Sequence, residues 1–206
     1  MQIWDNPSQV NLSQHIFMVL TPSTMLALGT PAPDFSLPDV VSGEIVSLST
    51  FQDKKALLVM FICRHCPYVK HIQIQLAQLG QDYQNTPLGI VAISSNDAQN
   101  YPADAPASLK EMALELGFTF PFCYDETQEV AKAFTAACTP DFFLFDQEFK
   151  LAYRGQLDDS RPSLAIPVTG QDLRQAIDQL LVGKSVNPEQ KPSIGCNLKW
   201  KAGNEP

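Results

Sequence analysis

Two cysteines separated by two residues are the feature of this sequence whose spacing most clearly predicts chemistry. Cys63 and Cys66 enclose Arg64 and His65, after an apolar run and before residues with helical spacing. In a first helical turn this spacing places two sulfurs within bonding reach, and the helix N-terminus stabilises a thiolate. The positive charges of Arg64 and protonated His65 favour the thiolate further. We therefore expect thiol–disulfide exchange through a mixed disulfide that the second sulfur resolves.

Two other interpretations of these cysteines are core packing and zinc binding. Unpaired cysteine often fills a protein core, but charged residues between two cysteines at a strand–helix junction do not suit simple filler. A structural zinc site needs four ligands, usually as two pairs. The second pair is missing here, because Cys123, Cys138 and Cys196 stand alone. We favour redox chemistry over both, and we expect Cys123 to lie in the core.

A second motif, Cys138-Thr139-Pro140-Asp141, stands directly before the apolar stretch 142–145. Proline is permitted at the first residue of a strand, so an ordinary strand entry is one interpretation. A cis bond before Pro140 would instead mark a tight turn. Cys138 precedes this proline, and Cys196 lies on a tail long enough to fold back. One hypothesis is that either exchanges with the Cys63–Cys66 disulfide, and the alternative is that both are buried filler.

The elements that must position these residues alternate between strand and helix. The sequence predicts short strands at 34–37 and 45–48, a buried strand at 56–62, a helix at 68–83, a strand at 88–94, a helix at 107–116, an extended piece at 121–124, a helix at 128–136, strands at 142–145 and 151–154, a loop at 155–170 and a helix at 171–182. Alternation predicts parallel strand pairing, and the last two strands predict an antiparallel hairpin. The expected fold is α/β, with a mixed central sheet flanked by helices.

The length of 206 residues fits one domain with extensions. We expect a flexible lead-in over residues 1–27, in which Met18 is an alternative start to Met1. The domain itself is expected over 28–183. Residues 184–206 show no clear period, and we expect them to form a tail that packs on the domain.

The charge balance and the cysteine count restrict the partners and the compartment. With 14 Lys and Arg against 22 Asp and Glu, the net charge is −8, which disfavours nucleic acid and anionic lipid. No apolar run is long enough for a transmembrane helix. No Lys or Arg precedes Lys54, so we expect no secretory signal. Five cysteines are an odd number and too few for a disulfide scaffold, so we expect a cytoplasmic protein.

Four segments together resemble one known family, over about residues 25–200. They are Thr30–Phe35, Cys63–His71, Leu157–Pro162 and Pro192–Trp200. These segments resemble the peroxiredoxin-like redoxins, relatives of the alkyl hydroperoxide reductase/thiol-specific antioxidant family. The resemblance implies a thioredoxin-like fold with an N-terminal β-hairpin extension and two redox-active thiols.

The resemblance also implies roles for individual residues. Cys63 would be the nucleophile and Cys66 the resolving cysteine, while Thr139 and a cis Pro140 would hold a substrate backbone. The partners would be disulfides or thiols of proteins or small molecules. No bound cofactor is expected, because the electrons reside on the cysteines. The central stretch 56–62 lacks the buried acid of thioredoxin, and Arg64-His65 predicts a more oxidising disulfide than thioredoxin's.

Two other functions stay open at this point. The family pattern of true peroxiredoxins places the peroxidatic cysteine at Cys66, before Pro67, with Cys63 as its reductant. This sequence departs from that pattern, because Cys63, Val59 and Pro140 stand where the peroxiredoxin pattern has Thr, Pro and Arg. The remaining function is a redox-sensing binding module, whose disulfide would change a partner surface without turnover.

Overall fold

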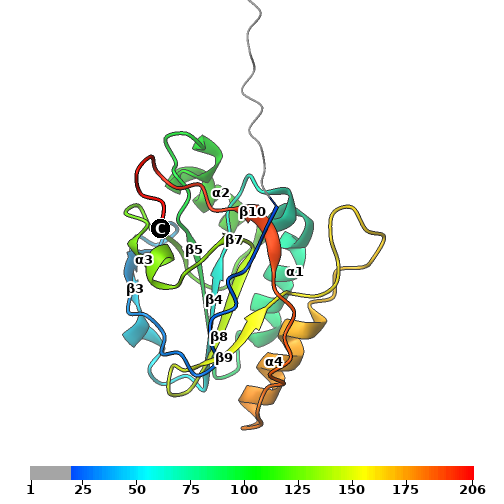
Figure 1. Ribbon diagram of the computed structural model, residues 1–206. Helices are drawn as coiled ribbons and strands as arrows, with labels where there is room; N and C mark the ends of the chain where they lie inside the picture. The colour runs from blue at the N-terminus through cyan, green and yellow to red at the C-terminus, as the bar shows by residue number, and fades with distance from the viewer. Residues whose placement is uncertain (1–19) are drawn as a thin grey trace, which may run out of the picture.

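A five-stranded mixed sheet forms the centre of the protein, of which the computed structural model describes residues 20–206 (Figure 1). Its strand order is β6-β5-β4-β8-β9. The strands are β4 (Ala56–Phe61), β5 (Leu88–Ser94), β6 (Phe122–Tyr124), β8 (Asp141–Asp146) and β9 (Leu151–Gly155). β4 pairs in parallel with β5, and β5 with β6, whereas β4–β8 and β8–β9 are antiparallel. The expected mixed sheet is confirmed.

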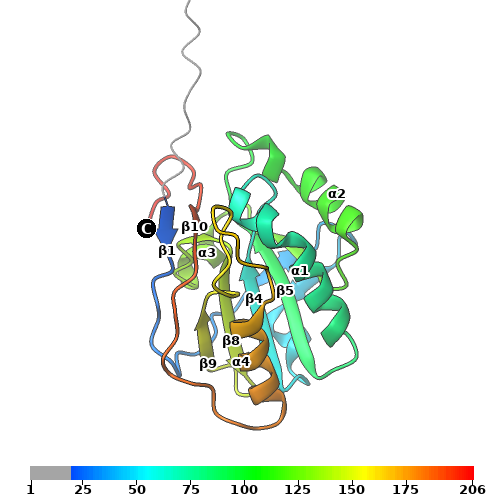
Figure 2. The ribbon, with the colours of Figure 1, turned by 90° about the vertical axis from the view of Figure 1, so that its right-hand side faces the viewer.

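Helices cover both faces of this sheet. They are α1 (Pro67–Tyr83), α2 (Pro106–Leu116), α3 (Glu129–Ala133) and α4 (Gln171–Leu181), with 3₁₀ turns η1 (Leu48–Phe51) and η2 (Pro102–Asp104). Figure 2 shows α1 and α4 on the same face of the sheet. The apolar side chains of α1, α2 and α4 join one core cluster, and those of α3 join the cluster on the opposite face.

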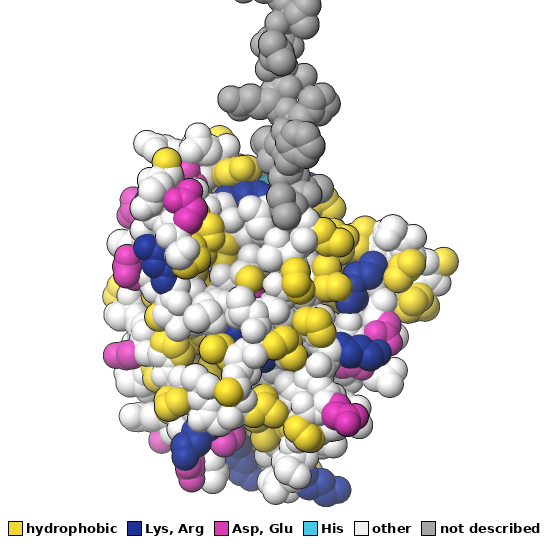
Figure 3. All heavy atoms as spheres, in the orientation of Figure 1, with side chains coloured by type: hydrophobic (Ala, Val, Ile, Leu, Met, Phe, Trp, Pro, Cys, Tyr) yellow, Lys and Arg dark blue, Asp and Glu magenta, His cyan; other side chains and the backbone are white. Residues whose placement is uncertain are grey.

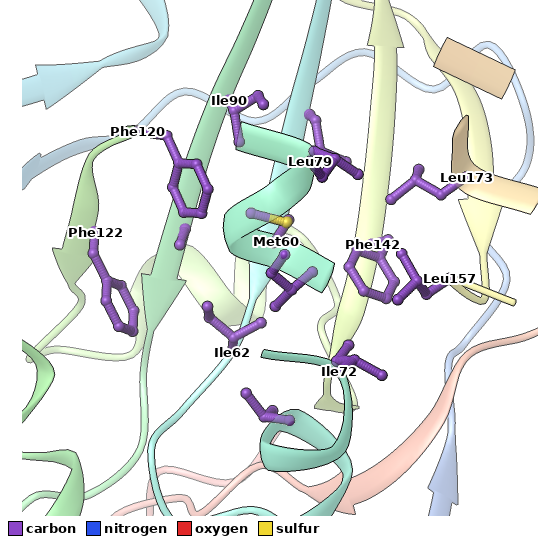
Figure 4. Close-up of a cluster of buried hydrophobic side chains, with 14 of the residues drawn as sticks. Met60, Ile62, Ile72, Leu79, Ile90, Phe120, Phe122, Phe142, Leu157 and Leu173 are labelled. Carbon is purple, nitrogen blue, oxygen red and sulfur yellow. The ribbon is translucent and has the colours of Figure 1, made fainter. Parts of the chain in front are cut away.

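The burial of strand β4 on both faces explains why its sequence is an unbroken apolar run. Leu58 and Met60 point into the cluster beneath α1, while Leu57, Val59 and Phe61 point into the other cluster. Every residue of β4 is buried, because both faces of the sheet are covered. Figure 4 shows the first cluster, in which side chains from the sheet meet those of α1 and α4. The cysteines that follow β4 are thus held at the end of the most buried strand.

Helix α3 is shorter than the predicted 128–136. The backbone of Gln128 has φ 65° and that of Thr135 has φ 51°, and this left-handed conformation does not continue an α-helix. By contrast, α2 ends as predicted, at Gly117 with φ 66°.

Three short strands form a second sheet that the sequence pattern does not predict. Its order is β1-β10-β7, from β1 (Leu20–Pro22), β10 (Ile194–Asn197) and β7 (Cys138–Thr139). Leu20–Pro22 are therefore paired, unlike the flexible lead-in expected over 1–27; residues 1–19, including Met18, lie outside the described residues. The expected N-terminal hairpin is present as β2 (Ser36–Pro38) and β3 (Ile45–Ser47). No helix within residues 20–206 has the length and apolar character needed to cross a membrane.

The loop between β9 and α4 projects from the body of the molecule (Figure 1). Its base is closed by Asp158, whose carboxylate accepts the backbone N–H groups of Ser160, Thr169 and Gly170. Its tip exposes Leu164 and Ile166. In Figure 3, hydrophobic side chains lie at this projection and also across the middle of the face in view, with acidic and basic side chains between them.

Candidate active site at the end of strand β4

Both cysteines of the motif are buried at the junction of β4 and α1. Cys63 follows the end of β4, and Cys66 is the N-cap of α1 with Pro67 next to it. Both residues have an exposed fraction of 0% and are unoxidised. The N-cap position gives Cys66 the unpaired backbone N–H groups and the positive end of the helix dipole.

A single residue, Thr139, contacts both sulfurs. Its hydroxyl lies 3.3 Å from Cys63 Sγ, and its carbonyl oxygen lies 3.2 Å from Cys66 Sγ. Thr139 ends β7, and the bond to Pro140 is cis, as the resemblance implied. The structure therefore brings the two predicted motifs, 76 residues apart, into one site. The substrate-binding role of Thr139 and Pro140 stays a prediction.

Hydrogen bonds concentrate negative charge on Cys66. The Cys196 and Cys63 thiols donate to Cys66 Sγ, as does the Val69 backbone N–H, and together these bonds lower the pKa of Cys66 despite its burial. The Thr139 carbonyl, which accepts a hydrogen bond from the Cys66 thiol, opposes this shift. Burial raises the pKa of Cys63, helped by the hydrogen bond to Cys66 and the charge of Asp104. Of the two thiols, Cys66 therefore has the lower pKa, although the resemblance gives the nucleophilic role to Cys63.

A buried carboxylate that the sequence analysis missed supports the Cys63–Cys66 turn. Asp104, at the end of η2, accepts the backbone N–H groups of Arg64 at 2.8 Å and His65 at 3.1 Å. It also accepts His65 Nδ1 at 2.5 Å and Asn96 Nδ2 at 2.8 Å. Burial raises its pKa, but the bonds from His65 and Asn96 outweigh burial, and the pKa is lowered. The buried carboxylate at this site thus comes from a distant turn that has no sequence signature, and it binds the residues between the two cysteines.

The two residues between the cysteines have different surroundings. The His65 ring stacks on Tyr101, with a centroid distance of 5.2 Å, while it binds Asp104. The Arg64 guanidinium instead reaches α2, where it pairs with Glu111 at 2.7 Å and Glu115 at 3.2 Å. Its charge is therefore shared with two carboxylates, which weakens its effect on the sulfurs. The predicted pKa-tuning role of Arg64 and His65 stays a prediction.

One set of potential metal ligands overlaps this site. Ligand atoms of Cys63, His65 and Asp104 lie within 4.8 Å of one another. A carboxylate offers about four lone-pair positions, and four donors already occupy those of Asp104. Since His65 Nδ1 is also used, a metal would have to displace existing hydrogen bonds, and the arrangement fits a thiol site better.

The three remaining cysteines have separate environments. Cys196 lies in β10 opposite Thr139 and hydrogen-bonds Cys66. Cys138 lies in β7, where its sulfur contacts the Pro140 carbonyl at 3.5 Å and burial raises its pKa. Cys123 lies in the core as expected, and burial raises its pKa to about 12. Of the two predicted secondary redox cysteines, the structure thus brings Cys196 into contact with Cys66.

A buried ion pair holds the loop that carries Thr139 and Pro140. Arg154 and Asp141 have side-chain exposures of 0% and lie 3.2 Å apart. Asp141 also accepts the Ala137 N–H, while Arg154 donates to the Thr135 carbonyl. Burial raises the pKa of Asp141 to about 6, with Arg154 opposing the shift. These bonds fix both ends of the short segment that touches the sulfurs.

One protein family and several solved structures are similar to this chain. The AhpC/TSA family model matches residues 28–154. An uncharacterized conserved protein from Geobacillus kaustophilus shares 54% identity, over 89% of this chain and 97% of that one, with a TM-score of 0.87. A hypothetical protein from Sinorhizobium meliloti shares 49%, over 89% and 100%, with a TM-score of 0.87.

A more distant structure shares the fold. A putative thiol:disulfide interchange protein DsbE from Chlorobium tepidum is 21% identical, over 76% of this chain and 99% of that one, with a TM-score of 0.60. No curated protein matched this chain. The expected thioredoxin-like fold is confirmed.

Proposed function

This chain belongs to the AhpC/TSA family of thioredoxin-like redoxins, and we propose that it is a thiol–disulfide oxidoreductase whose redox centre is Cys63 and Cys66. The observation that carries the proposal is the contact of both sulfurs with Thr139, beside a hydrogen bond between the two sulfurs. This bond makes one thiolate and one thiol available as a unit. No bound cofactor is needed, because two cysteines hold the two electrons.

In the first step, Cys63 attacks one sulfur of a substrate disulfide. The Cys63 proton passes along the existing hydrogen bond to the Cys66 thiolate, which therefore acts as the base. A bond forms between Cys63 and the attacked sulfur, the substrate S–S bond breaks, and the other substrate sulfur leaves as a thiolate. The raised pKa of Cys63 and the lowered pKa of Cys66 oppose this transfer, so the proton moves only as the bond between Cys63 and the substrate sulfur forms.

In the second step, Cys66 resolves the mixed disulfide. Its sulfur attacks Cys63, the Cys63–Cys66 bond forms, and the second substrate sulfur leaves and takes the Cys66 proton. Overall, two electrons pass from the cysteines to the substrate, which is released as one thiolate and one thiol. The reverse sequence oxidises a dithiol, and the relative potentials decide the direction.

The surrounding residues position the two cysteines. Asp104 binds the N–H groups of Arg64 and His65 and so fixes the turn between the sulfurs. We assign Thr139 and Pro140 to the backbone of the substrate, whose disulfide belongs to a protein or a small molecule. Since neither sulfur is exposed, neighbouring segments must move when the substrate enters. The odd cysteine count leads us to propose the cytoplasm as the compartment.

One observation favours a second function, reduction of hydroperoxides. Hydrogen bonds lower the pKa of Cys66, and Cys66 precedes Pro67 as the peroxidatic cysteine of the family does. In this reaction Cys66 takes one peroxide oxygen as a sulfenic acid while an alcohol leaves. The Cys63 thiol then condenses with it, water leaves, and the same Cys63–Cys66 disulfide results.

Single-turnover experiments separate these reactions. Reduced protein is mixed with a peptide disulfide, and released peptide thiol is counted. We expect two thiols per chain from the wild type, one from Cys66→Ser, which stops at the mixed disulfide, and far slower release from Cys63→Ser. The matched control is Cys123→Ala, which removes a buried cysteine outside the site and should release two.

Each departure from this pattern has a defined meaning. Fast release of one thiol by Cys63→Ser and none by Cys66→Ser would mean that Cys66 attacks. Consumption of hydrogen peroxide without thiol release would support the peroxidase function instead. A reversible disulfide without turnover of either substrate would indicate a redox-sensing binding module.

A further inference from the structure

Strand β10 brings the C-terminal region directly onto the loop that touches the catalytic sulfurs. It pairs antiparallel with β7, placing Cys196 opposite Thr139 and Asn197 opposite Cys138. Gly195 permits this approach, because a Cβ at this position would lie 2.1 Å from the Thr139 carbonyl oxygen. Strand β10 therefore lies closer to β7 than any residue with a side chain at position 195 would allow.

Further hydrogen bonds fasten the start of the same strand. Ser193 Oγ donates to the Pro140 carbonyl at 2.6 Å. The Ser193 backbone N–H donates to Ser23 Oγ at 3.0 Å, and the Ser23 N–H donates to the Ser193 carbonyl at 2.9 Å. With β1 on its other edge, β10 is held on both sides, so the position of Cys196 is fixed by backbone contacts.

Hydrogen bonds connect the side chain of Cys196 to the two cysteines of the motif. It is 2% exposed and hydrogen-bonds Cys66, which in turn hydrogen-bonds Cys63. Cys66 is thus the central sulfur, with one cysteine on each side. Cys138 differs, because its sulfur contacts the Pro140 carbonyl.

We propose that Cys196 is a third redox thiol, which attacks Cys66 in the Cys63–Cys66 disulfide and moves the bond to Cys66–Cys196. This inference rests on the proposed function, since that reaction forms the first disulfide. The Cys66–Cys196 bond forms as the Cys63–Cys66 bond breaks, and the Cys196 proton passes to the leaving Cys63 sulfur. No external oxidant is consumed, because the step only relocates a disulfide.

This step gives the oxidised protein two disulfide forms with different properties. In the second form the two oxidising equivalents lie in a bond between α1 and the C-terminal strand. Cys63 is then a thiol again while the protein remains oxidised. Cys66 is the sulfur attacked because it is the one in contact with Cys196.

Disulfide mapping of the full-length chain tests this inference. Tryptic cleavage after Arg64 places Cys63 on peptide 56–64 and Cys66 on peptide 65–70, while Cys196 falls on 185–199 and Cys138 on 133–150. Reduced protein is oxidised with diamide, remaining thiols are alkylated, and linked peptides are identified by mass spectrometry. In the wild type we expect both 56–64/65–70 and 65–70/185–199 links.

The decisive variant is Cys63→Ser, in which Cys66 has Cys196 as its neighbouring thiol. We expect the 65–70/185–199 link to form there, to persist in the matched control Cys63→Ser/Cys138→Ser, and to disappear in Cys63→Ser/Cys196→Ser. Circular dichroism of each variant checks that it is folded. A folded Cys63→Ser protein that leaves Cys66 alkylated, or links it to peptide 133–150, would overturn the inference.

The two proposals fail in different ways. If the wild type forms the 56–64/65–70 link and turns over disulfides, but no link to 185–199 appears in any variant, only the role of Cys196 is refuted. If the wild type shows no turnover while Cys63→Ser forms the Cys66–Cys196 link, the proposed function fails and the contact between these sulfurs stands.

Discussion

Replacement of Cys196 by alanine should raise the pKa of Cys66 by about one unit. The Cys196 thiol makes the largest contribution to lowering that pKa. A hydrogen bond to a charged group contributes about 1.5–3 kcal/mol, and a thiol is a weak donor, so the lower end applies. Since one pKa unit corresponds to about 1.4 kcal/mol, loss of this donor raises the pKa by about one unit.

Thiolate absorbance at 240 nm, followed between pH 3 and pH 9 in the reduced protein, measures this shift. Wild type should show one thiolate per chain well below the ordinary range of cysteine, and Cys66→Ser should lose that signal. In Cys196→Ala the midpoint should move to higher pH. The matched control is Cys138→Ala, which removes a neighbouring buried thiol but leaves every hydrogen-bond donor to Cys66 in place.

An unchanged or lower midpoint in folded Cys196→Ala protein would refute the reasoning, because it would mean that the Cys196 thiol does not stabilise the Cys66 thiolate. A wild-type signal that survives in Cys66→Ser but vanishes in Cys63→Ser would refute the location of the thiolate itself. The rate of alkylation by iodoacetamide at pH 6 gives an independent reading of the same thiolate.

Three further changes have defined outcomes. Asp104 has a lowered pKa, so it contributes stability above pH 3.8 that is lost as the pH falls through its folded-state pKa. Between pH 5 and pH 3 the free energy of unfolding in urea should therefore fall less in Asp104→Asn than in wild type, and an equal fall would contradict this. Gly195→Ala should lower the free energy of unfolding in urea by about 1–3 kcal/mol, because the new Cβ meets the Thr139 carbonyl. It should also reduce the yield of the Cys66–Cys196 disulfide, and wild-type stability would show that β10 tolerates displacement. Arg154→Met leaves Asp141 buried without its charged partner, so unfolding at pH 8 should show a loss of about 3–5 kcal/mol relative to wild type. The loss should shrink as the pH falls from 8 toward 6, because Asp141 without Arg154 is protonated above its wild-type pKa of about 6; a loss independent of pH would contradict the role of that charge.

The sequence predicted most of the framework because its elements carry strong, local patterns. The run at 56–62 is apolar throughout because both faces of β4 are covered, and α1 keeps its apolar residues on one face. Gly117 ends α2 as its position predicts. Cys63 and Cys66 were found the same way, since their spacing and their place between strand and helix are local features of the chain.

The partners of those cysteines were decided by tertiary structure. Strands β7 and β10 have two and four residues, too few for an alternating pattern to be recognised, yet their pairing places Cys196 opposite Thr139. Asp104 likewise lies in a three-residue turn, and only folding brings its carboxylate under Arg64 and His65. The sequence alone thus predicted which sulfurs react, because the spacing behind that prediction is local. The fold decided which of the two sulfurs has the lower pKa, because it brings the Cys196 donor from a distant strand to Cys66.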